Sequence, residues 1–375
     1  MWPGRSDRRP DMNGANATVE FGVTLKTRDG RSVAFACGPE ERMLDAAERQ
    51  DLYPPAQCGE GSCGACLAYV VSGEVEREPS GPSALPDRER AKGGVLLCRC
   101  RPLSDVELSA PYDAAMIRFE PEPERDAVIE AIEVLSAPMR RLVLRLGPGR
   151  DGGTGVDFEP GQYLELTVPG TDLTRAYSIA STPNWDGRVE LLIRLQPGGR
   201  FGTWLNETAA PGMRLVARGP RGAFVLRDRG LDPRWFVAGG SGLAPVLSML
   251  RRMAEWGDPQ PARLFYGTWR PDEQVCQDEL TTLQSSLPGL EIVRTVANPG
   301  TEPGAEPNPS WAAGTGSVVN ALSASLEAAS RQGEPLPDIY VCGSSGMVEA
   351  IRAAAVKAGL PEDRVFHEQC GGAVG

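Results

Sequence analysis

Hydrophobic and polar positions alternate near the start of the chain, which predicts short β-strands with one buried face. Residues 19–25 and 32–35 flank the dipeptide Asp29-Gly30, which favours a tight hairpin turn. Residues 43–52 are helix-forming with several apolar positions, and they stop before Pro54-Pro55, so we expect a short helix there. The chain is therefore predicted to open with two strands and a helix.

A second alternating region begins after Ala110–Arg125, a stretch rich in proline and acidic residues that we take as a domain boundary. Glycine and proline residues separate the alternating stretches, and this spacing predicts a small antiparallel barrel. The strands expected in it are 128–134, 141–146, 163–168, 176–180 and 189–195.

The last third alternates apolar strands with helical periodicity, which predicts a parallel sheet whose ligand lies at the carboxyl ends of the strands. A strand at 235–238 leads into a glycine turn at 239–242, and apolar residues at helical spacing follow until Gly257. Residues 298–316 are expected to form a surface loop. Further elements are expected at 263–266, 291–294 and 338–342 as strands and at 346–358 as a helix.

Composition narrows the class of protein. The chain has 375 residues and a formal net charge of -11, which argues against nucleic-acid binding and suits a protein partner better. No segment offers the roughly 20 apolar residues that a membrane span needs. Residues 1–17 lack the apolar core of a signal peptide and are expected to be a disordered lead-in. Nine cysteines, four of them spaced as ligands, indicate a reduced, cytoplasmic protein.

The cysteines Cys58, Cys63 and Cys66 follow the C-x4-C-x2-C spacing of plant-type 2Fe-2S ferredoxins, with a further cysteine downstream. Thiolates are soft, anionic ligands that stabilise ferric iron. A zinc site is the alternative, but it usually pairs two C-x2-C motifs or adds histidines, and this chain has one histidine. Both Cys98 and Cys100 follow an apolar strand, and alternation would direct them to the same face, so the spacing leaves the fourth ligand open.

The stretch Arg175-Ala176-Tyr177-Ser178 lies on a predicted barrel strand and has the chemistry to hold a flavin. Arg175 can neutralise a pyrophosphate, Tyr177 can lie against the ring system, and the Ser178 hydroxyl can hydrogen-bond near the flavin N5. Downstream, Gly198-Gly199 precedes a short helical start whose N–H groups could take a phosphate. Read separately, these stretches could be an ordinary strand and an ordinary turn.

The glycine turn at 239–242 would bring bare backbone to a dinucleotide phosphate at a helix N-terminus, although it departs from the G-x-G-x-x-G fingerprint. Cys342-Gly343 occupies the carboxyl end of a predicted strand in the same sheet. Asp272 and Glu273 could hydrogen-bond a ribose hydroxyl and repel a 2′-phosphate, which favours NADH, whereas Arg270 argues for NADPH.

Taken in order, the cysteine pattern, Arg-x-Tyr-Ser, Gly-Gly-Ser-Gly-Leu-Ala-Pro and Cys-Gly-x-x-x-Met resemble the ferredoxin-reductase family with an N-terminal ferredoxin. Residues 169–178 and 236–248 are similar to the reductase components of soluble methane monooxygenase and its relatives. The resemblance implies a multidomain α+β and α/β fold. Its parts would be a β-grasp ferredoxin domain at 18–112, an antiparallel β-barrel flavin domain at 125–229 and a parallel-sheet nucleotide-binding domain at 232–375.

The same resemblance implies FAD, one 2Fe-2S cluster and NADH, with electrons delivered to a separate di-iron hydroxylase. It implies Cys98 as the fourth iron ligand, and it implies that Ser178, Cys342 and Glu368 surround the flavin–nicotinamide contact. The chain has Gly202 where the family commonly has a serine, so the flavin phosphate would rest on backbone N–H groups or on Thr203. The cofactor-binding residues expected are Arg175, Tyr177, Ser178, Arg194, Gly198, Gly199, Arg200, Thr203, Gly239, Gly240, Ser241, Gly242, Asp272, Cys342 and Gly343.

Two alternatives remain at this point. The first is the reductase of a Rieske-type aromatic-ring dioxygenase, which shares the same three modules and differs in its partner. The second is a zinc-stabilised nucleotide-binding adaptor without electron transfer, which would be colourless. The cysteine spacing argues against the adaptor.

Overall fold

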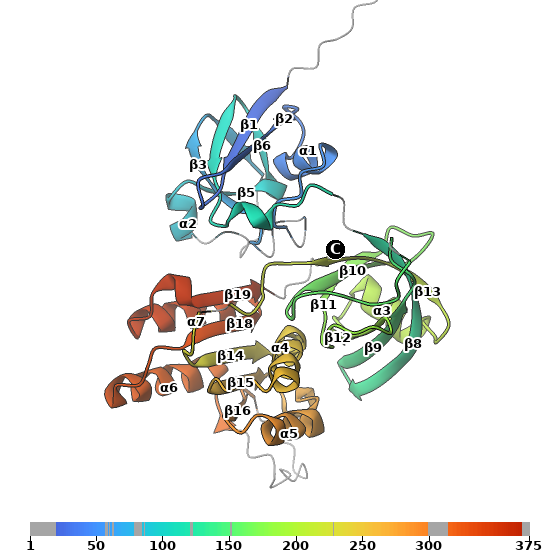
Figure 1. The fold of residues 1–375 in the computed structure, drawn as a ribbon, viewed down its shortest axis with the longest axis vertical. Helices are drawn as coiled ribbons and strands as arrows, with labels where there is room; N and C mark the ends of the chain where they lie inside the picture. Colours follow the sequence, from blue (N-terminus) through green and yellow to red (C-terminus); the bar gives the residue numbers. More distant parts are fainter. Residues whose placement is uncertain are drawn as a thin grey trace, which may run out of the picture.

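The computed structural model describes residues 20–56, 59, 61, 64–78, 85, 87–120, 123–150, 152–227, 229–298 and 314–369. Within these ranges the chain forms three sheet-based parts that follow one another along the sequence (Figure 1). The predicted multidomain fold is therefore confirmed. The expected lead-in at 1–17 and most of the expected loop at 298–316 lie outside the described residues. No helix in the described ranges has both the length and the apolar character of a bilayer span.

The first part, blue to teal in Figure 1, is a mixed five-stranded sheet with a helix packed against it. Its sheet contains β1 (Phe21–Lys26), β2 (Ser32–Cys37), β3 (Leu67–Ser72), β5 (Gly94–Leu96) and β7 (Val106–Ser109), in the order β2-β1-β7-β3-β5. The remaining elements are α1 (Met43–Arg49), α2 (Asp87–Ala91), the 3-10 turns η1 (Leu97–Arg99) and η2 (Ala114–Met116), and the ribbon of β4 (Val75–Arg77) with β6 (Cys100–Pro102). The β1–β2 hairpin turns at Gly30, whose φ of 80° favours glycine. Helix α1 buries Met43, Leu44, Ala46 and Ala47 in the core of this part.

The second part is a six-stranded antiparallel sheet that curls into a barrel. Its elements are β8 (Glu124–Ser136), β9 (Met139–Leu146), β10 (Tyr163–Thr167), β11 (Thr174–Ser178), β12 (Arg188–Arg194), α3 (Arg200–Glu207) and β13 (Arg214–Arg221). The strand order is β11-β10-β13-β8-β9-β12, and an antiparallel bridge from Ile179 to Leu191 joins the two edges. The sequence pattern did not predict β13, because its three exposed or half-buried arginines and its Gly219-Pro220 pair disguise the buried Leu215 and Ala217.

The third part is a six-stranded parallel sheet with helices on both faces. Its strands are β14 (Arg234–Gly239), β15 (Ala262–Thr268), β16 (Leu290–Val296), β17 (Gly314–Thr315), β18 (Asp338–Gly343) and β19 (Val365–Gln369), in the order β17-β16-β15-β14-β18-β19. Its helices are α4 (Leu243–Trp256), α5 (Gln277–Ser286), α6 (Val318–Gln332) and α7 (Ser345–Lys357), with 3-10 turns η3 (Gly240–Gly242), η4 (Pro271–Glu273) and η6 (Glu362–Arg364).

The faces of this sheet are covered as a doubly wound fold requires. Helices α4 and α5 share one apolar core with one face of the sheet, and α6 and α7 share a second core with the opposite face. Helix α4 ends at Gly257, whose φ of 61° is the left-handed cap that the sequence predicted. The parallel strands bring the glycine turn, Cys342 and Glu368 to the same edge of the sheet.

Candidate functional site

Three residues from different elements meet where the barrel contacts the parallel sheet. The Ser178 hydroxyl, at the end of β11, donates a hydrogen bond of 2.7 Å to Glu368 Oε2 on β19. Cys342 on β18 is paired with Glu368 in the sheet, and its Sγ lies 3.9 Å from the same oxygen. Cys342 is fully buried and Glu368 is 5% exposed. The fold thus brings together the three residues that the resemblance implied at a shared reaction site.

The strand β11 can accommodate a flat ligand. It is an edge strand of the barrel sheet, and all five of its residues are half-buried, so neither face is fully packed. The Tyr177 ring packs against Phe201 with a centroid distance of 5.1 Å. Burial raises the pKa of Tyr177 well above its ordinary value, so the phenol stays neutral. Arg175 keeps its guanidinium on this strand, where it donates to the carbonyl oxygen of Thr174 at 2.7 Å.

The second half of the expected flavin site lies at the start of α3. Gly198 has a φ of 75° and nothing within 4 Å of a built Cβ, and Gly199 is the residue that precedes the helix. Thr203 lies in the first turn, and its backbone N–H already bonds to the carbonyl of Gly199. Arg200, the first residue of α3, forms an exposed ion pair with Asp172 at 2.6 Å. The Arg175 guanidinium and the α3 N-terminus fit an anionic flavin pyrophosphate.

The glycine turn between β14 and α4 fits a dinucleotide. A Cβ built on Gly242 would lie 2.2 Å from the carbonyl oxygen of Cys342, and one on Gly239 would lie 2.8 Å from Met347 Sδ. A Cβ on Gly343 would lie 2.3 Å from Met347 Cε. Only glycine therefore allows the turn and the end of β18 to pack this closely. The resulting cradle, which includes Gly240 and Ser241 in η3, lies at the N-terminus of a 14-residue helix.

Two further expected residues lie beside this cradle. Arg194, at the end of β12, donates to Glu273 Oε1 at 2.8 Å and so reaches from the barrel to the nucleotide-binding part. Glu273 is 4% exposed and also accepts from the backbone N–H of Trp269, so its carboxylate is already engaged. Asp272 is the accessible carboxylate of the pair, and it forms an exposed ion pair with Arg270 at 3.0 Å.

The sulfur atoms of Cys66 and Cys98 lie 3.2 Å apart in the first part, and both residues are 1% exposed. This separation is longer than a disulfide and fits two thiolates directed at one metal centre. Cys58 and Cys63 lie outside the described residues, and within the described ranges no group of three or more metal-ligating side chains gathers. The described geometry therefore provides half of the expected ligand set.

The strand alternation expected across Cys98 and Cys100 is interrupted in the structure. Cys98 lies in the 3-10 turn η1, which interrupts the strand alternation, whereas Cys100 begins β6. Cys100 is fully buried and its sulfur contacts Met43 Sδ at 3.7 Å, whereas it is the Cys98 sulfur that contacts Cys66. Burial raises the pKa of the Cys100 thiol far above its ordinary value, which keeps it protonated. The geometry favours Cys98 as the ligand.

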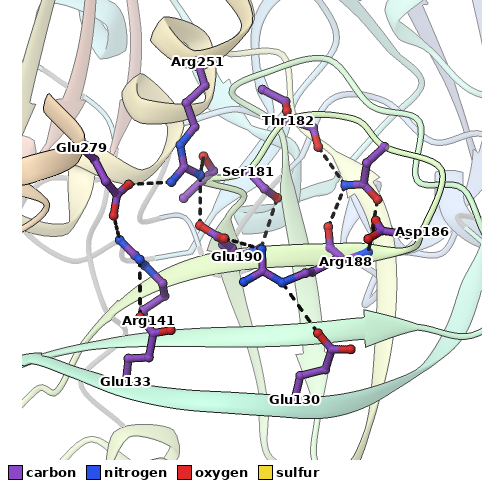
Figure 2. Close-up of polar contacts among 12 residues, drawn as sticks. Glu130, Glu133, Arg141, Ser181, Thr182, Asp186, Arg188, Glu190, Arg251 and Glu279 are labelled. Atoms are coloured by element: carbon purple, nitrogen blue, oxygen red, sulfur yellow. Dashed lines mark hydrogen bonds and ion pairs between the residues drawn. The ribbon is translucent and has the colours of Figure 1, made fainter. Parts of the chain in front are cut away.

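A network of charged residues between the barrel and the nucleotide-binding part was not predicted from the sequence (Figure 2). Arg251 on α4 donates to Glu190 Oε2 on β12 at 3.0 Å and to Glu279 Oε2 on α5 at 2.5 Å. Arg141 on β9 also binds Glu279. The partners are far apart in the chain and lie on ordinary strands and helices, so no local motif identifies them.

Comparison with known proteins agrees with this architecture. Models of three protein families match successive segments: the 2Fe-2S iron-sulfur cluster binding domain at residues 26–103, the oxidoreductase FAD-binding domain at 126–226 and the oxidoreductase NAD-binding domain at 236–353. The methane monooxygenase component C of Methylosinus trichosporium is 36% identical over 82% of this chain and 87% of its own length. The toluate 1,2-dioxygenase electron transfer component of Pseudomonas putida is 32% identical over 92% of this chain and 97% of its own length.

A solved structure gives the same result. The Amycolatopsis cytochrome P450 reductase GcoB superposes with a TM-score of 0.69 at 29% identity, covering 93% of this chain and 98% of the other. The cofactors predicted from the sequence, FAD, a 2Fe-2S cluster and a nicotinamide dinucleotide, are confirmed by the matched domains. The chain belongs to the ferredoxin-reductase family of oxidoreductases, as a monooxygenase-type reductase component with an N-terminal 2Fe-2S ferredoxin domain.

Proposed function

We propose that this protein oxidises NADH and delivers the electrons, one at a time, to the hydroxylase of a separate di-iron monooxygenase. The observation that carries the proposal is the meeting of Ser178, Cys342 and Glu368 between the FAD-binding and NAD-binding domains. A flavin bound there would accept a hydride as two electrons and release them singly, which a cluster requires. The 36% sequence identity to methane monooxygenase component C supports a monooxygenase hydroxylase as the partner.

Residues of this chain would hold the flavin and the nicotinamide next to each other. The Ser178 hydroxyl, fixed by Glu368, would face the flavin edge, and Tyr177 would flank the ring. Buried Cys342 lies beside the Gly242 turn, so a nicotinamide whose phosphates rest on that turn would lie close to the flavin. Because Cys342 and Glu368 are both buried, the contact would exclude water, which protects a transferring hydride.

Arg175 with the N-terminus of α3 would bind the FAD pyrophosphate, and Asp272 would accept a hydrogen bond from the adenosine ribose of NADH. Cys58, Cys63, Cys66 and Cys98 would bind the iron. We further propose that the protein acts in the cytoplasm, since its ligand thiolates must stay reduced to hold the cluster.

The acceptor is tested by reconstituting this protein, in separate assays, with a purified di-iron hydroxylase and with a purified Rieske-type oxygenase. We expect NADH-dependent substrate oxidation only when the oxygenase is a di-iron hydroxylase, with no product when this protein or NADH is left out. The similarity to the toluate dioxygenase component favours a Rieske-type oxygenase as the second candidate. Product formation with a Rieske oxygenase, and none with a di-iron hydroxylase, would replace the first assignment by the second.

A further inference from the structure

A row of three side chains crosses the rim of the FAD-binding barrel. The strand β10 lies between β11 and β13, and its first residue, Tyr163, is paired with Ser178 on one side and with Arg221 on the other. Residues paired in this way project from the same face of a sheet. Ser178 belongs to the cluster at the flavin–nicotinamide contact. Tyr163 is therefore a direct neighbour of the proposed reaction site.

The other end of Tyr163 reaches the ferredoxin domain. Its hydroxyl donates a hydrogen bond of 2.6 Å to the carbonyl oxygen of Ala56, two residues before Cys58 in the chain. Tyr163 has no exposed surface. The Tyr163 ring packs directly against Gly222, so closely that a Cβ added to that glycine would lie 3.0 Å from the ring. This close packing confines the ring in one orientation. One rigid side chain thus connects β10, the strand paired with the one that carries Ser178, to the chain just before the cysteine loop.

A second contact between the same two domains lies next to the first. Arg221 Nη2 is 3.6 Å from Glu48 Oε1 in α1 of the ferredoxin domain, and Arg221 Nη1 donates to Glu165 at 2.8 Å within the barrel. The Arg221 side chain is 11% exposed and that of Glu48 is 33% exposed. The ion pair is therefore partly shielded from solvent, where a charge pair orients two surfaces more effectively than on an open face.

We propose that Tyr163 is a positioning residue for internal electron transfer, with the Arg221–Glu48 pair as its supporting contact. This inference rests on the proposed function. NADH would give up a hydride and become NAD⁺, and the proton of that hydride would be released to solvent. The two electrons would leave the flavin site one at a time, the second only after the one-electron cluster has passed the first to the acceptor protein. Such transfer slows steeply as the two centres separate. The Tyr163 bond to Ala56 would fix that separation, because it ties β10, the neighbour of the flavin strand β11, to a backbone carbonyl two residues before Cys58 in the sequence.

The first test compares Tyr163→Phe with wild type by anaerobic stopped-flow after mixing the holoenzyme with NADH. Loss of one hydrogen bond lowers a docking equilibrium by about fivefold, so we expect cluster reduction to slow by about fivefold while flavin bleaching stays within about twofold. Protection of the amides of residues 49–53 and 56 from hydrogen exchange should fall by a similar factor. Tyr112→Phe is the matched control, because the Tyr112 hydroxyl is buried without a hydrogen-bond partner in the described chain.

The second test uses Glu48→Gln, which leaves Tyr163 intact, with Glu107→Gln as its control because Glu107 pairs with Lys26 inside the ferredoxin domain. We expect Glu48→Gln to reduce amide protection and slow cluster reduction, and Glu107→Gln to change neither. The inference is overturned if either readout keeps its wild-type value in both Tyr163→Phe and Glu48→Gln. Failure of the proposed function looks different, since NADH would then leave the flavin of the wild-type protein oxidised.

Discussion

The functional role of a single residue is hard to infer from the sequence alone, as the cluster of Ser178, Cys342 and Glu368 illustrates. Each has an ordinary alternative role, as a solvated serine, a small buried cysteine or a surface carboxylate. Their joint placement became an expectation only through the motifs around them. The structure adds a physical reason, since Glu368 is 5% exposed and accepts a hydrogen bond from a residue 190 positions away. Removing a carboxylate from water costs free energy, so a buried carboxylate such as that of Glu368 points to a functional role.

Removing the Ser178 hydroxyl should weaken the proposed flavin contact. Ser178→Ala deletes one hydrogen bond to a charged group, so we expect NADH to reduce the flavin about tenfold more slowly. Anaerobic stopped-flow absorbance measures this rate. Ser323→Ala is a matched control, because that hydroxyl bonds only within α6, to the carbonyl of Val319. An unchanged rate in Ser178→Ala would remove Ser178 from the hydride step.

The fourth iron ligand is a further prediction at the residue scale. Cys98→Ser should abolish the cluster, because the Cys98 sulfur lies 3.2 Å from that of Cys66, whereas Cys100→Ser should retain it because Cys100 contacts Met43. Iron content, visible absorbance and the EPR signal of the reduced protein measure the outcome. A cluster that survives in Cys98→Ser and is lost in Cys100→Ser would reverse the assignment.

At the scale of elements, strands and helices could be predicted where the hydrophobic residues recur regularly, and they were missed where this periodicity is weak. The strand, glycine turn and helix around 235–256 were predictable because a short apolar run, adjacent glycines and helical spacing follow one another. The strand β19 was not predicted, since its sequence VFHEQ is short and largely polar. The strand β13 was missed because its alternation is broken by Gly219-Pro220. Both strands owe their place to neighbours that are distant in the sequence.

The glycine turn supports a prediction of its own. Gly242→Ala would place a Cβ 2.2 Å from the Cys342 carbonyl oxygen, so the turn must move away from β18. We expect a loss of about 3 kcal/mol in stability and a raised KM for NADH. Gly346→Ala is the control, because nothing lies within 4 Å of its Cβ and its helical position accepts alanine. Equal KM values for wild type and Gly242→Ala would contradict a role of this turn in binding NADH.

At the scale of the whole molecule, the sequence predicted which three domains follow one another but not how they pack. The contacts that fix the packing join residues with no shared motif: Tyr163 with Ala56, Arg251 with Glu190, and Arg141 with Glu279. Arg141 and Glu279 are 138 positions apart. The charged side chains among them would look like solvated surface residues in the sequence. The orientation of the domains depends on such contacts between distant residues, and a single sequence does not show which residues are in contact.

The junction between the barrel and the nucleotide-binding domain should depend on pH through Glu190. Burial alone would raise its pKa, but the guanidinium groups of Arg251 and Arg188 outweigh burial and hold the pKa of Glu190 below its ordinary value of 4.5. A carboxyl whose pKa is lowered on folding stabilises the fold above its unfolded-state pKa and loses that contribution at lower pH. The Glu190 contribution is therefore complete at pH 7 and disappears as the pH falls below about 4.5.

Glu190→Gln should accordingly lower the free energy of unfolding by about 2 kcal/mol at pH 7, and its difference from wild type should shrink towards pH 4. Denaturant unfolding at both pH values measures this. Glu291→Gln removes an exposed carboxylate that pairs with Arg263 and should cost less than about 1 kcal/mol at either pH. A Glu190→Gln difference that is the same at pH 4 and pH 7 would show that its charge does not stabilise the junction.

The most direct test of the whole account is an anaerobic titration of the purified holoenzyme with NADH, followed by visible absorbance and low-temperature EPR. If electrons pass from NADH through the flavin to the cluster, the flavin and cluster bands will both bleach and a reduced-cluster EPR signal will appear. A protein without a chromophore, or one whose cluster stays oxidised while NADH is present, would contradict the account.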